Sequence, residues 1–228
     1  MYFVAQGQPQ ERAEFIKKTY THLAGAVGVF ILLEVLLIQS GIAASLTQVL
    51  TASRFSWFAV LAVFALLGWM SRELAGRADS ISLQYGGLGL YVTIESLIFA
   101  PLIYIANSMY DPTIVPTAGI LTALMFAGLT AVAFTTGKDF TFLGGALKIG
   151  GCVAIGLMIC SAIFGFTLGL FFSVLMVGFA MAAILYDTSK IMHHYTKDQY
   201  VAASLELFAS VALLFWYVLR ILMSLNRR

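Results

Sequence analysis

Charged side chains are scarce in this chain. Asp, Glu, Lys and Arg together make up 11% of its 228 residues, whereas soluble domains usually contain about 25%. Hydrophobic residues make up 61%, and the mean hydropathy is +0.93. The sequence therefore predicts an integral membrane protein with the lipid bilayer as its surroundings. The net charge of +2, without a long run of basic residues, does not indicate nucleic-acid binding.

Cysteine is also rare: the chain contains two, Cys152 and Cys160. Eight residues apart on a helix, they would lie about 12 Å apart along its axis, which is too far for a disulfide. We interpret them as small buried or lipid-facing residues. The sequence lacks zinc, haem and nucleophile–base patterns, and the adjacent His193 and His194 point in different directions on a helix. We therefore expect no metal centre, no cofactor and no enzyme activity.

Long apolar runs take the place of the missing charge. Seven runs are near the length needed to cross about 30 Å of hydrocarbon; they fall at 21–42, 55–71, 82–106, 114–135, 143–164, 168–189 and 201–224. The second run is short and the gap before the sixth is brief, so six or eight spans are alternatives. The sequence predicts an all-α, polytopic, seven-helix bundle at 21–228, preceded by a polar arm at 1–20.

The placement of Lys and Arg predicts how the bundle is oriented. With a cytoplasmic N-terminus, cytoplasmic segments contain eight basic residues and the outer side contains four. This favours a cytoplasmic N-terminus and an outer C-terminus. The basic pair Arg227 and Arg228 is the evidence against it, because a six-span count would place that pair inside.

Small residues recur every four positions in the run at 114–135. They are Gly119, Ala123, Ala127 and Ala131. Small residues at this spacing let two helix backbones approach closely in lipid. We expect this face to pack tightly against a neighbouring helix, with a sliding interface as the alternative.

Acidic residues interrupt the apolar runs, although a lipid-facing charge costs several kcal/mol. The two that lie nearest each other in the predicted topology are Asp187 and Glu206, where the last two runs meet on the cytoplasmic side. Two neighbouring carboxyls in a low dielectric do not both ionise easily, so this pair would sense protons or bind a cation. Ser210 lies one turn after Glu206 on the same face. The alternatives are a hydrated or Lys190-paired Asp187 and a solvated Glu206.

Four further polar residues are secondary candidates. Glu34 and Glu95 lie deeper in their runs, and we interpret them as hydrogen-bonding between helices or as lining an ion path. Lys148 and Arg220 have side chains long enough to place their charge at the membrane surface. Pairing with a buried acid is the alternative for Lys148.

Three segments of the chain have a recognisable pattern. They are the polar turn and helix start at 137–145, the segment 184–191 followed by His193, and the segment 200–222. These segments resemble the Bax inhibitor-1 family, in particular its bacterial YccA-like branch. The resemblance extends over the seven-run pattern of nearly the whole chain. It implies a seven-helix bundle in which the last helix is surrounded by the other six.

The resemblance also implies two functions. Several family members are described as pH-sensitive calcium leak pathways that use one Asp on the sixth helix and one on the seventh. Asp187 matches the first of these, and Ser210 falls at the second, one turn after Glu206. Ca²⁺ is then the ion that would be bound or transported.

Members of the YccA-like branch are associated instead with a membrane-bound AAA protease, which they bind and restrain. For this chain the resemblance therefore implies a multi-pass protein of the bacterial inner membrane. It is either a cation leak or a modulator of such a protease, with the polar arm from Gln6 to Lys18 as a handle for that partner.

Overall fold

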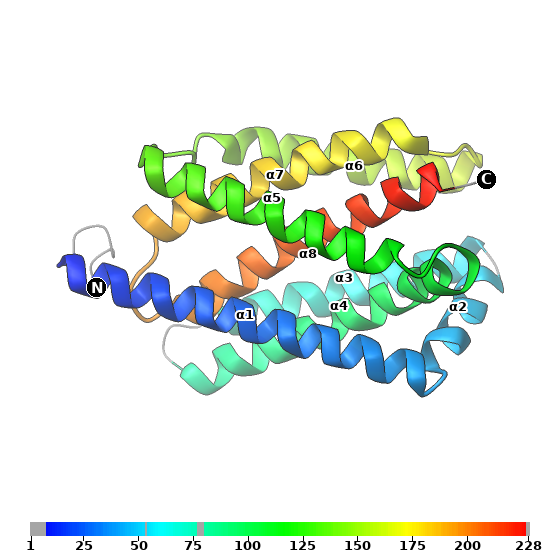
Figure 1. Cartoon of the computed structure of the whole chain (residues 1–228), viewed down its shortest axis with the longest axis horizontal. Helices are drawn as coiled ribbons and strands as arrows, with labels where there is room; N and C mark the ends of the chain where they lie inside the picture. The colour runs from blue at the N-terminus through cyan, green and yellow to red at the C-terminus, as the bar shows by residue number, and fades with distance from the viewer. Residues whose placement is uncertain (1–7, 53, 77–79, 227–228) are drawn as a thin grey trace. The chain divides into compact units, whose positions relative to one another are not determined.

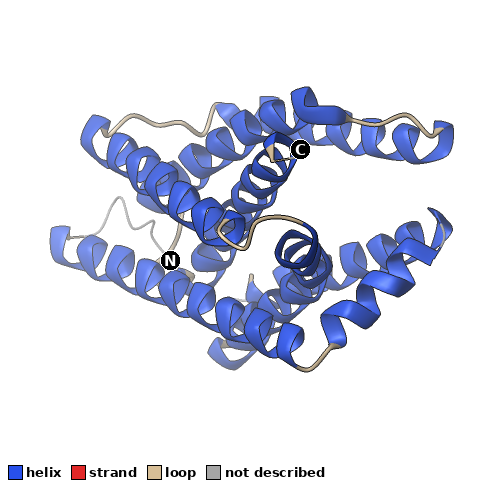
Figure 2. Cartoon of the chain, turned by 45° about the vertical axis from the view of Figure 1, so that its right-hand side comes forward, coloured by secondary structure: helices blue, strands red, loops and turns tan. Residues whose placement is uncertain are grey.

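The computed structural model describes residues 8–52, 54–76 and 80–226. Within these ranges every regular element is an α-helix (Figure 2). The helices are α1 (Pro9–Gln39), α2 (Ile42–Ala52), α3 (Arg54–Ala75), α4 (Ile81–Met109), α5 (Ile114–Thr136), α6 (Leu143–Phe164), α7 (Gly169–His193) and α8 (Tyr200–Leu225).

The prediction of an all-α, polytopic membrane protein is confirmed. Six helices of the described part, α1 and α4 to α8, are long and apolar enough to cross a membrane. The run predicted at 55–71 lies within α3, whose 22 residues extend about 33 Å at 1.5 Å per residue. The helix α2 was not predicted. It has 11 residues and follows a reversal at Gly41, where φ is +78°.

The helices form two compact units. Unit 1 contains α1 to α4 together with Tyr195–Phe208, which includes the first part of α8. Unit 2 contains α5 to α7 and the remainder of α8 from Ala209 onward. The single helix α8 therefore contributes side chains to both units.

In unit 1, α1 packs on α2 and α4 (Figure 1). Its buried residues are spaced three or four apart and so form one face of the helix; they are Phe15, Thr19, Leu23, Ala26, Phe30 and Glu34. The Phe30 ring meets Phe99 of α4 and Phe208 of α8 edge-on, with ring centres 5.2 and 5.9 Å apart. The apolar core of unit 1 is built around this face.

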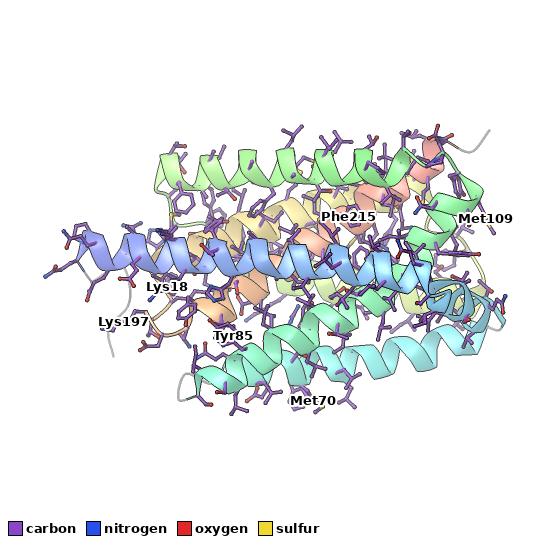
Figure 3. The ribbon with its side chains drawn as sticks, turned by 60° about the horizontal axis from the view of Figure 1, so that its bottom comes forward. Lys18, Met70, Tyr85, Met109, Lys197 and Phe215 are labelled. Atoms are coloured by element: carbon purple, nitrogen blue, oxygen red, sulfur yellow. The ribbon has the colours of Figure 1, made fainter. Side chains whose placement is uncertain are left out.

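The first half of α1 is tied to α4 and α8 by polar side chains. His22 Nε2 lies 2.7 Å from the Tyr85 hydroxyl, and Lys18 Nζ lies 5.6 Å from the centre of the Tyr200 ring. Lys18 and Tyr85 mark this end of the two helices in Figure 3. Tyrosine is enriched at membrane–water interfaces, and lysine near helix ends reaches toward them. These residues therefore indicate where α1 leaves the hydrocarbon.

The segment predicted as a polar arm is helical from Pro9 onward. Pro9 suits the first helical position, and the Glu11 carboxylate accepts a hydrogen bond from the Gln8 backbone N–H at 3.4 Å. Phe15 is 2% exposed and packs near Tyr195. Residues 9–20 thus continue into the first span as one helix, while residues 1–7 lie outside the described part.

Unit 2 has its core between α6, α7 and α8. Buried residues that pack together there are Ala154, Phe172, Met176 and Tyr217. On α6, Gly144 and Gly150 allow two aromatic rings of α7 to approach the backbone: a Cβ added there would lie 2.8 Å from Tyr186 and 3.1 Å from Phe179. Close α6–α7 packing therefore depends on these glycines.

The prediction for the small-residue face of α5 is wrong. Gly119, Ala123, Ala127 and Ala131 are all exposed, and nothing lies within 4 Å of a Cβ added at Gly119. The buried face of α5 carries Ala118 and Thr122 instead. Spacing alone does not distinguish a stripe that faces a helix from one that faces lipid, because both environments are apolar.

Close packing of α3 on α4 leads to a testable prediction. A Cβ added at Gly87 would lie 2.5 Å from the Ser71 carbonyl oxygen and 2.6 Å from the Ala75 nitrogen. Because both atoms belong to backbone that cannot rotate away, Gly87→Ala should destabilise the protein by about 1–3 kcal/mol. Gly86→Ala is the matched control, since nothing lies within 4 Å of its added Cβ. Thermal unfolding in detergent measures both, and equal midpoints would contradict the packing described.

Candidate functional site

The α7–α8 contact in unit 2 contains a buried acid with a hydroxyl partner. The Ser210 hydroxyl donates a hydrogen bond to Asp187 Oδ2 at 2.5 Å. Each residue is 8% exposed, so Asp187 is not a solvated side chain at the helix end. The structure thus brings together two of the predicted site residues.

The helical repeat explains why both side chains point inward. On α7 the buried residues Ala180, Ile184, Asp187 and Ile191 follow one another at three or four positions and share a face. On α8, Ser210 is four residues before the buried Leu214 and so lies on a buried face as well. The acid and the hydroxyl are therefore placed by the same apolar stripes that form the core.

Two residues after Asp187, Ser189 fixes the turn between α5 and α6. Its hydroxyl accepts a hydrogen bond from the Phe140 N–H at 2.8 Å and donates one to Asp139 Oδ1 at 3.1 Å. Asp139 Oδ1 also accepts from the Thr141 N–H at 2.9 Å. The turn starts at Gly137, which ends α5 with φ +59°. This network holds the turn against the end of α7 that carries Asp187.

Asp139 is the ionisable group of that turn and lies outside the spans. Hydrogen bonds from Thr141, with smaller contributions from Ser189 and His194, hold the pKa of Asp139 well below its usual value. A carboxyl with a depressed pKa contributes stability above the ordinary Asp pKa, and this contribution is lost as the pH falls. Its partner His194 lies 3.5 Å away, and the pair is ionic only when His194 is protonated. Both side chains are about half exposed, so water screens the pair.

In unit 1 a second cluster contains two of the predicted acids. Arg72 Nη2 donates a hydrogen bond to the Tyr91 hydroxyl at 3.3 Å. Glu95 lies one turn further along α4, close enough to Tyr91 for the two side chains to interact. Arg72 is close enough to Glu95 and Glu206 for their charges to act on it. Arg72 is therefore a cation near both acids.

Arg72 was not predicted as a site residue. In the sequence Arg72 follows an apolar run, and it was counted as one of the basic residues that predict the orientation in the membrane. The sequence feature that pointed to this cluster was the pair Tyr91 and Glu95, which lie four residues apart and so on one face of α4.

The remaining predicted residues lie apart from these clusters. Glu34 is 5% exposed, and neither carboxyl oxygen has a hydrogen-bond partner among the residues that the structure describes. Lys148 is exposed on α6, and Arg220 is half-buried on α8 near Tyr217. The predicted Asp187–Glu206 pair joins residues of different units and stays a prediction.

The donor atoms limit the chemistry of the Asp187–Ser210 contact. Cations such as Ca²⁺ take six to eight oxygen ligands in storage sites, and two side chains supply too few of them. Among the described residues, no group of three or more His, Cys, Asp and Glu side chains could hold a metal ion. The contact supplies one carboxylate and one hydroxyl as oxygen donors.

These features define a class of protein: an all-helical, multi-pass membrane protein with an acid in a buried contact between its last two helices. The chain belongs to the Bax inhibitor-1 family. The family described as "Inhibitor of apoptosis-promoting Bax1" matches residues 12–227, which is almost the whole chain. The expected resemblance is thus confirmed.

Similar curated proteins come from bacteria and from mammals. The chain is 37% identical over 110 residues to PA2604 of Pseudomonas aeruginosa, covering 48% of this chain and 49% of that protein. It is 32% identical over 139 residues to mouse Protein lifeguard 4, covering 59% and 55%. It is 32% identical over 120 residues to the Escherichia coli protein named Modulator of FtsH protease YccA, covering 52% and 53%. The chain thus spans about half the length of the curated relatives it matches.

The Asp187–Ser210 contact can be tested by a double-mutant cycle. Ser210→Ala removes a donor from a buried carboxyl and should lower stability by about 1–3 kcal/mol. The cost should be smaller in an Asp187→Ala background, because the carboxyl is already absent there. Thermal unfolding in detergent gives the coupling energy. Ser204→Ala is the matched control, since the Ser204 hydroxyl bonds to the Val201 carbonyl of its own helix. Strictly additive effects would rule the contact out.

Proposed function

We propose that this protein is a proton-gated cation leak of the bacterial inner membrane, with Ca²⁺ as its ion. The observation that supports the proposal is the buried hydrogen bond from Ser210 to Asp187. Ser210 stands where the resemblance places the second acid of the family. When the helices part, an ionised Asp187 would offer a passing cation its carboxylate oxygens. Protonation removes that charge, so flux should fall as the pH falls.

The proposed topology has seven spans, α1 and α3 to α8, with a cytoplasmic N-terminus and α8 in the middle. The length of α3 and its apolar sequence support a seventh span. Fully buried residues occur in both halves of α8, which supports a central helix: Leu205, Leu207, Leu214 and Leu219 are each at most 1% exposed. The excess of basic residues in the predicted cytoplasmic segments supports the orientation.

Calcium entry into liposomes tests the leak. Asp187→Asn keeps the shape of the side chain but cannot ionise, so the pH dependence of the flux should disappear. Ser210→Asp places a second carboxyl beside Asp187. Two carboxyls at this separation share a proton, so the midpoint of the flux should move to higher pH.

The flux assay has two further arms. Glu206→Gln tests whether the acid of unit 1 belongs to the same path, and Glu14→Gln is the control, because Glu14 is exposed and paired with Lys18 at 2.8 Å. Equal fluxes in the wild type, Asp187→Asn and Glu206→Gln at every pH would remove the leak from consideration.

A modulator of a membrane-bound AAA protease is the second candidate. It is favoured by the Escherichia coli relative named for modulation of FtsH protease, which is 32% identical over the aligned part. In this case the polar segment before the membrane would be what the protease grips. The helical start of α1 limits that handle, because Phe15 is part of the core.

Deleting residues 2–8 tests the handle without removing Phe15. If the protease grips this segment, the truncated protein should have a longer half-life, and a substrate of the same protease should be degraded faster because restraint is lost. Pulse-chase measurements in cells follow both proteins. A control that replaces residues 2–8 with an equally long Gly/Ser segment separates the need for a length of chain from the need for this sequence. Unchanged turnover of both proteins would argue against the modulator.

A further inference from the structure

Glu34 is a carboxyl in the core of unit 1 without a hydrogen-bond partner among the described residues. It continues the buried face of α1 one turn beyond Phe30, and it is 5% exposed. Both of its oxygens are buried and lack a hydrogen-bond partner among the described residues. A buried ionised carboxylate without a partner is far more costly than a neutral one.

The described side chains of the elements around Glu34 do not supply a counter-charge. The helices α2 and α4 pack on α1, and Phe208 of α8 contacts Phe30 on the same face. The sequence of α2 contains no ionisable residue. The ionisable residues of α4 and of the unit 1 part of α8 are Tyr85, Tyr91, Glu95, Tyr104, Tyr200 and Glu206. Within the described part of the chain, none of them hydrogen-bonds to the Glu34 carboxyl or acts on it electrostatically.

Two positive features of unit 1 do not stabilise a negative charge at Glu34. The N-terminus of α1, where a helix favours a carboxylate, lies at Pro9 at the far end of the helix. Arg72, a cation of α3, is engaged with Tyr91. The contacts of the Phe30 ring with Phe99 and Phe208 lie one turn away on the same face of α1. The surroundings on this face are therefore apolar.

We propose that Glu34 is a reversible proton-binding site that holds a proton in the conformation described here. The carboxyl would lose this proton only when α1, α2 and α4 part enough to admit water. Ionisation and opening are then linked, because the open form gains the hydration of the charge. The site goes beyond the proposed leak, since it requires neither conduction through the Asp187–Ser210 contact nor a protease partner.

Dicyclohexylcarbodiimide, an apolar reagent for protonated carboxyls, tests the proposal. The acid oxygen adds to the central carbon of the reagent and the acid proton goes to one nitrogen; an acyl shift to nitrogen then gives a stable N-acylurea, and no atom leaves. The full chain in liposomes should carry one adduct at Glu34, found by peptide mass spectrometry. A water-soluble carbodiimide should leave Glu34 unmodified, because the side chain is closed to water.

Glu14 is the matched control within the same helix. It is exposed and paired with Lys18, so it should react with the water-soluble reagent and not with the apolar one. Labelling of the unmutated chain does not depend on whether any variant folds. Reaction of Glu34 with the water-soluble reagent, or failure to react with the apolar one, would overturn the proposal.

Infrared spectroscopy provides a second readout. The carbonyl band of a protonated carboxylic acid should be present in the wild type and should lose intensity in Glu34→Gln. The amide imitates the shape of the neutral acid, so this variant should unfold at a midpoint close to that of the wild type. An unchanged acid band in a folded Glu34→Gln protein would contradict a protonated Glu34. Both measurements are independent of calcium flux, so they can fail or succeed separately from the leak.

Discussion

The structure depends on one constraint: a polar side chain inside the hydrocarbon region must find its partner within the protein, because lipid provides none. In this chain the apolar helical stripes place those side chains on buried faces. On α7, Asp187 occupies a position of the stripe that runs from Ala180 to Ile191, and on α1, Glu34 continues the stripe that begins at Phe15. The packing of these apolar stripes into the core therefore also fixes the positions of the two acids.

Most of the fold could be predicted because an apolar run of about twenty residues has few structural options in a membrane. Each predicted run coincides with an observed helix. The short helix α2 was missed because it carries no charge pattern and is too short to span. The α5 stripe was misjudged because small residues are equally apolar toward lipid and toward protein. Partners such as Arg72 for Glu206 are more than a hundred residues apart in sequence, and spacing on one helix says nothing about them.

The Asp187–Ser210 contact differs chemically from a pair of acids. Two neighbouring carboxyls share a proton because their negative charges repel. Loss of that proton separates such a pair. A hydroxyl instead donates to an ionised carboxylate without competing for a proton. The hydrogen bond in this chain therefore joins α7 to α8 without a second charge. The neighbouring network around Ser189 and Asp139 holds the same end of α7, so the turn between α5 and α6 stabilises the helix that presents the acid.

The intramembrane acids thus have three different environments. Asp187 has a hydroxyl donor, Glu95 and Glu206 lie within electrostatic reach of Arg72, and Glu34 has neither kind of partner among the described residues. Removing a partnered acid leaves its donor or cation unsatisfied, which costs free energy. Removing Glu34 leaves no described group unsatisfied, because none is bonded to it, and an apolar residue of similar size would fill the same space at lower cost. Stability alone therefore explains the acids of the two clusters but not the acid on α1, where a role in binding a proton supplies the missing reason.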